Sequence, residues 1–488
     1  MALERLEEIR DLRLKKRQQL IAAGKPPYPS EARRTHTVAE ALKNFSSLST
    51  DKQAIMLTGR VMAVRAHGGV IFIDLHDQSG AIQLQANKKT LAEAEFSQVK
   101  ALDSGDFVQV AGFLTKTQRG VETVEITEIT LISKAIRPLP DNWYGLKDIE
   151  TRYRQREVDL LMNPAVRSVF ETKAKTISAL RAYLEKEGFT EVETPVLQSI
   201  AGGAAAKPFT THHNALDMSL TLRIAPELYL KRLLVGGFEK VYEIGRNFRN
   251  EGISRQHNPE FTMLEFYWAY ADYEDLMDFT EHLLQTITKA ITGNMETAWQ
   301  DTQLNWKSIT RQRYVDIVSD RLDLNILEEK DPNAYLEIFK REGLEAPTVR
   351  TYAKVVDELY KALVRPGIVQ PTILYDYPVE MVPLAKTSLA DSRIAEMFQL
   401  VVAGTELVKA YSELNDPVIQ RERFEEQQKA RAAGDEEMPP IDESYIRALE
   451  YGMPPAGGLG LGVDRLIMLL TNTSNLRDTI LFPLLKNE

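Results

Sequence analysis

Cysteine is absent from this chain of 488 residues. Its absence excludes disulfides, a cysteine nucleophile and thiolate zinc sites. No run of apolar residues approaches the roughly 20 that a membrane-spanning helix needs. The first 20 residues are charged and do not read as a signal peptide. The sequence therefore predicts a soluble intracellular protein that acts in the cytoplasm without a membrane partner.

The chain also lacks an excess of positive charge: acidic residues outnumber basic ones, and the formal net charge is −10. Such a balance argues against indiscriminate binding of nucleic acid. Residues 1–34 differ, with nine Lys and Arg against five Asp and Glu. Within a helix predicted over residues 1–23, Arg10, Arg13, Lys16 and Arg17 recur at helical spacing. This segment either contacts a phosphate backbone or is a merely solvated helix, and the sequence leaves both interpretations open.

Short runs of alternating apolar and polar residues fill the stretch from Ile55 to Ile132. Five such runs separated by glycine-containing turns are typical of a small closed barrel of the OB type, which binds oligonucleotides, although the pattern alone fits other small barrels. We predict an N-terminal extension at 1–50, the barrel at 51–136 and a proline-containing linker at 137–160. A second domain at 161–488 would follow, with a mostly helical insertion at about 300–375.

A polar loop separates two strand-like segments in the stretch 246–273, RNFRNEGISRQHNPEFTMLEFYWAYADY. This arrangement predicts an antiparallel hairpin. On its second strand Phe261, Met263, Glu265 and Tyr267 share one face, because side chains alternate along a strand. A carboxylate between aromatic residues on a half-buried face needs a partner. That partner is either a structural cation in the protein or a bound ligand.

The same stretch resembles motif 2 of the class II aminoacyl-tRNA synthetases, and in detail that of the lysyl family. GFTEVETPVL at 188–197 resembles motif 1, and GLGLGVDR at 458–465 resembles motif 3. The similarity runs in the family's order from about residue 50 to the C-terminus. It implies an α+β fold, in which a five-stranded OB-fold β-barrel precedes a catalytic domain with an antiparallel sheet flanked by helices. It also implies a homodimer.

The activity that this resemblance implies is ATP-dependent activation of L-lysine, with Mg²⁺, and its transfer to tRNA(Lys). The implied ATP-binding residues are Arg249, Glu251, His257, Asn258, Phe261, Glu406 and Arg465, with Arg249 and Arg465 catalytic. The implied lysine-binding residues are Gly203, Glu227, Arg249, Glu265, Tyr267, Lys409 and Glu413. The implied metal ligands are Gln399, Glu406 and Glu413. On the barrel, the implied anticodon-binding residues are Arg65, Phe72, Gln83 and Glu128.

These residue types suit the implied chemistry. Adenylate formation requires positioning and charge neutralisation, and arginine binds carboxylate or phosphate through two parallel hydrogen bonds. A buried lysine ammonium requires acidic partners. The glycines at 458, 460 and 462 allow a strand to pass close to a nucleotide.

Two positions depart from the family pattern. Lys409 stands where the family has an asparagine that contacts the substrate carboxylate, and Gln399 stands at one of two metal-binding carboxylate positions. These departures are the only support for one alternative, a catalytically impaired RNA-binding regulator. Another alternative is a paralogue that attaches lysine to a protein side chain. The anticodon-binding barrel argues against it.

Overall fold

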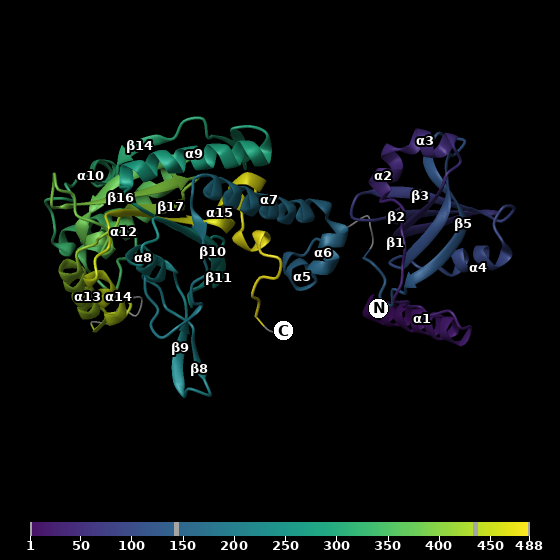
Figure 1. Ribbon diagram of the computed structural model, residues 1–488, viewed down its shortest axis with the longest axis horizontal. Helices are drawn as coiled ribbons and strands as arrows, with labels where there is room; N and C mark the ends of the chain where they lie inside the picture. Colours follow the sequence, from purple (N-terminus) through teal and green to yellow (C-terminus); the bar gives the residue numbers. More distant parts are fainter. Residues whose placement is uncertain (1, 141–145, 433–437, 487–488) are drawn as a thin grey trace. The chain divides into compact units, whose positions relative to one another are not determined.

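The computed structural model describes residues 2–140, 146–432 and 438–486, and the chain divides into two compact units, Met1–Asp148 and Ile149–Glu488 (Figure 1). Residues 141–145 of the predicted linker and residues 433–437 lie outside this description. Within the described ranges, no helix is long and apolar enough to cross a membrane.

The first unit is a closed five-stranded barrel with the strand order β1-β2-β3-β5-β4. Its strands are β1 (Ala54–His67), β2 (Val70–His76), β3 (Ala81–Asn87), β4 (Phe107–Lys116) and β5 (Glu122–Ser133). Around it lie α1 (Ala2–Ala22), α2 (Val38–Lys43), α3 (Phe45–Thr50) and α4 (Glu93–Ala101). Alternate residues such as Ile71, Ile73 and Leu75 fill the barrel, as the period of two requires. The predicted five-stranded barrel is confirmed.

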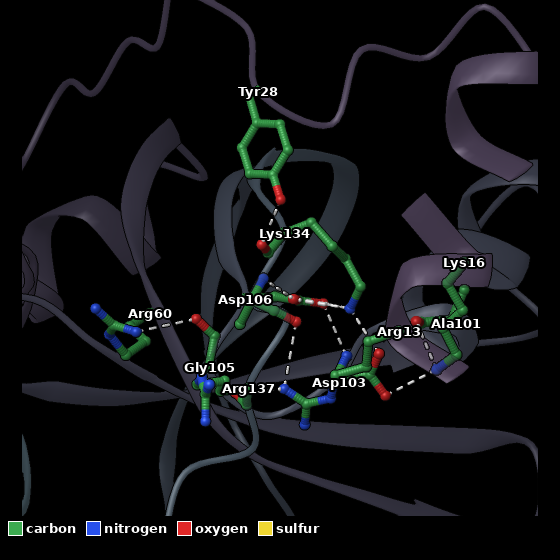
Figure 2. A network of polar contacts seen from close by, with 11 residues as sticks. Arg13, Lys16, Tyr28, Arg60, Ala101, Asp103, Gly105, Asp106, Lys134 and Arg137 are labelled. Atoms are coloured by element: carbon green, nitrogen blue, oxygen red, sulfur yellow. Dashed lines mark hydrogen bonds and ion pairs between the residues drawn. The ribbon is translucent and has the colours of Figure 1, made fainter. Parts of the chain in front are cut away.

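Two of the basic residues on α1 fasten this helix to the barrel unit (Figure 2). The Arg13 guanidinium donates to the carbonyls of Ala135 and Arg137, at 3.3 and 2.9 Å. Lys16 Nζ lies 2.7 Å from Asp103 Oδ1. These contacts give Arg13 and Lys16 a structural role in the N-terminal segment.

The second unit is built on a sheet of eight strands with the order β14-β15-β16-β17-β18-β11-β10-β6. The strands are β6 (Thr190–Glu191), β10 (Lys240–Phe248), β11 (Glu260–Ala269), β14 (Thr310–Arg313), β15 (Thr372–Pro378), β16 (Ile394–Val402), β17 (Thr405–Ser412) and β18 (Ala456–Gly462). The six inner strands pair antiparallel, and only the two edge strands pair parallel. The predicted hairpin is β10 and β11, and the predicted α+β fold is confirmed.

Helices cover the two faces of this sheet unequally (Figure 1). One face, which includes Leu264 and Phe266 of β11, packs on α7 (Pro164–Lys186), α9 (Tyr273–Thr292) and α15 (Val463–Thr471). The other face carries Glu265 and Tyr267, and α8 (Glu227–Val235) packs beside them. The first face is apolar core, while the second combines another large apolar cluster, which includes Val241 and Met397, with the buried carboxyl group of Glu265.

The remaining elements surround this frame. They are α5 (Ile149–Arg154), α6 (Arg156–Met162), β7 (Leu197–Gln198), β8 (Thr210–His213), β9 (Met218–Leu222), α13 (Pro417–Ala432) and α14 (Glu443–Glu450), with short helical turns at Pro332–Tyr335, Tyr360–Val364, Arg365–Gly367, Val379–Met381 and Leu476–Thr479. Helices α5 and α6 lie in the stretch interpreted as linker, and both belong to the second unit.

The predicted insertion contains helices α10 (Tyr314–Leu322), α11 (Leu336–Arg341) and α12 (Tyr352–Leu359). Strands precede them, because β12 (Glu296–Trp299) and β13 (Thr302–Asn305) form a hairpin and β14 joins the main sheet. The turn of the hairpin places Gln300 at a φ of 50°, which polar residues tolerate better than branched ones. Sequence reasoning missed these short strands.

Candidate active site

The glycines of β18 form the floor of the candidate site. Gly458 is paired with Tyr267 on β11 and with Tyr411 on β17, and Gly460 is paired with Glu265 and Lys409 in the same way. Residues opposed across a sheet point to the same face. The side chains of β11 and β17 therefore flank a strip of bare backbone on which a ligand can lie.

A cavity of about 1120 Å³ opens over this strip. The residues assigned by resemblance that line it are Gly203, Glu227, Arg249, Glu251, His257, Asn258, Phe261, Glu265, Tyr267, Gln399, Glu406, Lys409 and Arg465. Glu413 is only 1% exposed and lies beside Gly458 and Tyr267. The structure thus brings the predicted ATP and lysine residues into one place.

Three buried carboxylates gather at one end of the cavity. They belong to Glu227, Glu265 and Glu413, which are each at most 5% exposed. Two tyrosine hydroxyls donate to them: Tyr411 to Glu227 Oε1 at 2.6 Å, and Tyr267 to Glu265 Oε2 at 3.3 Å. Buried carboxylates are costly without cations, so this end of the cavity is a receptor for positive charge.

Lys231 is a member of this cluster that sequence reasoning missed. Its Nζ donates to Glu227 Oε1 at 2.6 Å and forms an ion pair with Glu413. The available signal was the spacing of Glu227 and Lys231, four residues apart on one helix. That spacing is typical of exposed pairs on helix surfaces, and only the fold shows that both side chains are buried.

The same contact involves Glu413, which the resemblance assigns as a metal ligand. The Lys231 ammonium is paired with Glu413 Oε2. Of the other proposed ligands, Gln399 Oε1 accepts a hydrogen bond from Tyr377 at 3.1 Å, and Glu406 faces the cavity. Among the residues that the structure describes, no group of three or more His, Asp or Glu is arranged to hold a metal.

Glu265 has a strongly altered acidity. Burial raises its pKa to about 8; the nearby Glu227 carboxylate adds to this effect, and Arg249 opposes it. At pH 7 the ligand-free carboxyl is therefore mostly protonated. An ammonium bound beside it favours the ionised form and lowers this pKa.

Lysine affinity should therefore depend on pH. Below pH 8, binding of L-lysine is expected to release a proton from Glu265, so affinity should rise with pH, by up to about tenfold per unit, and level off near pH 8. Calorimetry in buffers of different ionisation enthalpy measures the protons released. Glu265→Gln should abolish this release. Affinity that falls between pH 6 and 8 would contradict the assignment.

Arginines occupy the other end of the cavity. The Arg249 guanidinium lies 5.1 Å from the centre of the Phe261 ring. Arg465 donates to the carbonyl of Glu406 at 2.6 Å and lies 3.4 Å from His257 Nε2. These groups come from β11, the loop before it and α15, and they form a cationic end suited to phosphate.

His257 is neutral in this setting. Burial lowers its pKa, and the neighbouring cations Arg465 and Arg365 lower it further. Arg365 and Lys361 belong to the turns after α12 and also line the cavity. Sequence reasoning found no chemical role in this insertion, because only the fold places it against the hairpin loop.

The barrel gathers three of its four predicted RNA-binding residues. Arg65 is opposite Phe72 on neighbouring strands, and Gln83 is opposite Asp74. Arg65 is held by Asp74 through two hydrogen bonds of 2.5 and 2.6 Å. Alternate residues of these strands point outward, so Arg65, Phe72 and Gln83 share the outer face.

Glu128 lies further along the barrel, three positions after Glu125 on β5. Gln83 is opposite Thr123 on β5, and Glu128 lies five positions further along, opposite Ala111. At about 3.3 Å per residue this separates Glu128 from the Gln83 row by roughly 16 Å. Glu125, opposite Gln85, lies closer to Phe72.

Phe72→Ala should impair tRNA charging by about 10-fold or more, because stacking on one aromatic ring contributes about 1–3 kcal/mol per base. Adenylate formation should stay within about twofold, since the catalytic cavity lies in the other unit. Phe107→Ala is the matched control, because Phe107 lies on the same barrel beside Arg60. Equal losses in charging for both variants would show that the barrel merely needs its aromatic residues for stability.

Comparison with known proteins agrees with this architecture. Residues 148–486 match the family model described as tRNA synthetases class II (D, K and N), and residues 55–139 match the OB-fold nucleic acid binding domain. The chain is 47% identical over 487 residues to the lysine–tRNA ligase of Carboxydothermus hydrogenoformans, covering 99% of each chain. It is 45% identical over 494 residues to that of Moorella thermoacetica, covering 100% of this chain and 99% of the relative.

The fold and the cavity define a class II tRNA synthetase unit preceded by a nucleic-acid-binding barrel. Within that class, the chain belongs to the lysine–tRNA ligase family. Its similarity to these relatives includes the barrel and extends over nearly the whole length. Nothing in the comparisons favours the regulator or the protein-modifying paralogue.

Proposed function

We propose that this protein is an enzyme that activates L-lysine with ATP and transfers the lysyl group to the 3′ end of tRNA(Lys). The observation that carries this proposal is the cluster of three buried carboxylates, Glu227, Glu265 and Glu413, beside a cavity that Arg249 and Arg465 also line. A substrate with an ammonium group at the end of its side chain, and with an α-ammonium beside a carboxylate that must reach a phosphate, matches this distribution of charge.

In the first step, an oxygen of the lysine carboxylate attacks the α-phosphorus of ATP, and the bond to the leaving pyrophosphate breaks. Arg249 would bind the carboxylate and the α-phosphate together, and Arg465 would bind the outer phosphates. In the second step, the terminal ribose hydroxyl of the tRNA attacks the carbonyl carbon. AMP leaves, and the hydroxyl proton is released.

A magnesium ion is compatible with this site as a partner of ATP. Mg²⁺ commonly binds through one or two carboxylates together with substrate phosphates and water. Glu406 supplies one carboxylate in the cavity, and the amide oxygen of Gln399 is a weaker donor. The ion would neutralise phosphate charge, and these two residues would hold it.

A homodimer is part of the proposal. The segment that resembles motif 1 leaves apolar residues exposed: Val196 is 39% and Leu197 50% accessible. Exposed apolar surface next to a structured strand is suited to contact with a second copy. Light scattering during size-exclusion chromatography should give twice the 55.3 kDa of one chain.

The tRNA substrate would place this enzyme in the cytoplasm.

The decisive experiment is amino-acid-dependent ATP–pyrophosphate exchange with each of the twenty standard amino acids. Exchange with lysine alone is expected. The variant Lys409→Asn should be measured in parallel, because Lys409 is paired across the sheet with Gly460, which is paired on its other side with Glu265. If the parent exchanges nothing and the variant exchanges lysine, Lys409 has disabled activation. If another amino acid is exchanged in place of lysine, the proposed substrate is wrong.

A further inference from the structure

A lysine side chain of the protein itself occupies the carboxylate cluster. Lys231 lies one turn after Glu227 on α8 and is fully buried. Its Nζ donates to Glu227 Oε1 and forms an ion pair with Glu413 Oε2. The rings of Tyr267 and Tyr411 lie 5.9 and 5.4 Å from this nitrogen. An ammonium of the protein is therefore held by the same kinds of group that would recognise a substrate ammonium.

In Glu227 and Glu413, the carboxylate oxygens have different surroundings. Glu413 uses Oε2 for Lys231, while its Oε1 lies over Gly458, where it would overlap any Cβ on that residue. Glu227 uses Oε1 for Lys231 and for the Tyr411 hydroxyl, and its stem packs within 2.8 Å of the Cβ position of Gly203. Lys231 thus fixes one oxygen of each carboxylate and leaves Oε1 of Glu413 directed at the floor of the cavity.

The cluster also has a definite charge balance. When all three carboxylates are ionised, they and the Lys231 ammonium together carry a net charge of −2. In the proposed function, L-lysine would bring its side-chain ammonium and its α-ammonium to these carboxylates, with the carboxylate beside the α-ammonium bound by Arg249. Uncompensated buried charge is strongly unfavourable, so two positive charges suit this cluster better than one or three.

We propose that Lys231 is a specificity-determining positioning residue: its ammonium orients Glu227 and Glu413 and sets the charge of the pocket to match a diamino acid. This inference rests on the proposed function, because it assigns both carboxylates to the substrate. Lys231 acts through them and does not contact the reacting atoms.

The test is a double-mutant cycle read by calorimetric binding of L-lysine. Lys231→Met in the parent should weaken lysine binding by about 10- to 100-fold, because both carboxylates lose their orienting partner. In a Glu413→Gln background, Lys231→Met should have the opposite effect on lysine affinity. There the Lys231 ammonium keeps only Glu227 and repels the incoming ammonium, so removing it should strengthen lysine binding relative to Glu413→Gln alone.

A merely structural role would give the same loss in both backgrounds and would lower ATP affinity as well; either result overturns the inference. Lys231→Arg keeps the charge and should retain more affinity than Lys231→Met. If Lys231→Met does not fold, Lys231→Gln gives the same comparison. Failure of the proposed function is distinguishable, because the parent would then not bind L-lysine at all, whereas an additive cycle on a lysine-binding parent refutes only the role of Lys231.

Discussion

Replacing Glu413 by glutamine is expected to weaken lysine binding by about 100- to 1000-fold while ATP binding changes by less than about threefold. Glu413 is 1% exposed, is paired with Lys231, and directs its other oxygen to the floor at Gly458. Removing one partner of a buried ion pair costs about 3–5 kcal/mol, and the pair that would affect lysine affinity is the proposed one between Glu413 and the substrate ammonium. About 1.4 kcal/mol corresponds to tenfold in affinity.

The measurement is calorimetric titration of the same preparation with L-lysine and with ATP. Glu406→Gln is the reciprocal control, because Glu406 lies beside Arg465 at the cationic end of the cavity. It should weaken ATP binding in the presence of Mg²⁺ and leave lysine binding nearly unchanged. If Glu413→Gln weakens ATP and lysine binding equally, Glu413 stabilises the whole cavity and does not select the amino acid.

Gly458→Ala is expected to reduce lysine-dependent pyrophosphate exchange by about 100-fold or more. A Cβ on residue 458 would overlap Glu413 Oε1 and lie 2.5 Å from Cε1 of Tyr267. Both side chains are buried, so neither can move away freely. The methyl group would therefore displace the Glu413 carboxylate, which we propose binds the substrate ammonium.

Gly460→Ala is the matched control on the same strand. Its Cβ would meet chiefly the terminal methyl of Met263, at 3.1 Å, and a flexible methionine can move. Its loss of exchange activity should be at least about tenfold smaller than that of Gly458→Ala. Melting temperatures of both variants separate loss of the site from loss of the fold. Equal losses would show that the floor tolerates no side chain anywhere and that Glu413 has no special role there.

Local pattern was sufficient for much of the fold. The polar loop between two alternating segments predicted the hairpin of β10 and β11, which is present. Five alternating runs predicted the barrel. By contrast, β12, β13 and β14 have only four residues each. In such short segments a period of two is hard to distinguish from a polar turn, so they were assigned to a helical insertion.

For the site, the sequence identified candidate residues, and the fold determined which of them lie close together. Resemblance selected Glu227, Glu265 and Glu413, and the structure brings them together. It could not reveal that Lys231 is buried among them, because a glutamate and a lysine four residues apart have the same local pattern on an exposed helix. Nor could it separate Glu128 from Phe72, since that separation depends on the register of β5 against β3.

The sequence by itself determined the class of fold, the family and the identity of most residues around the cavity, because these depend on local periodicity and on motifs read along the chain. Only the tertiary structure showed that the three carboxylates lie together in the core and that Lys231 is paired with two of them. The physical reason is that burial and charge pairing are properties of groups brought together from distant segments. Their energies depend on the surrounding dielectric and on partners that no local pattern specifies.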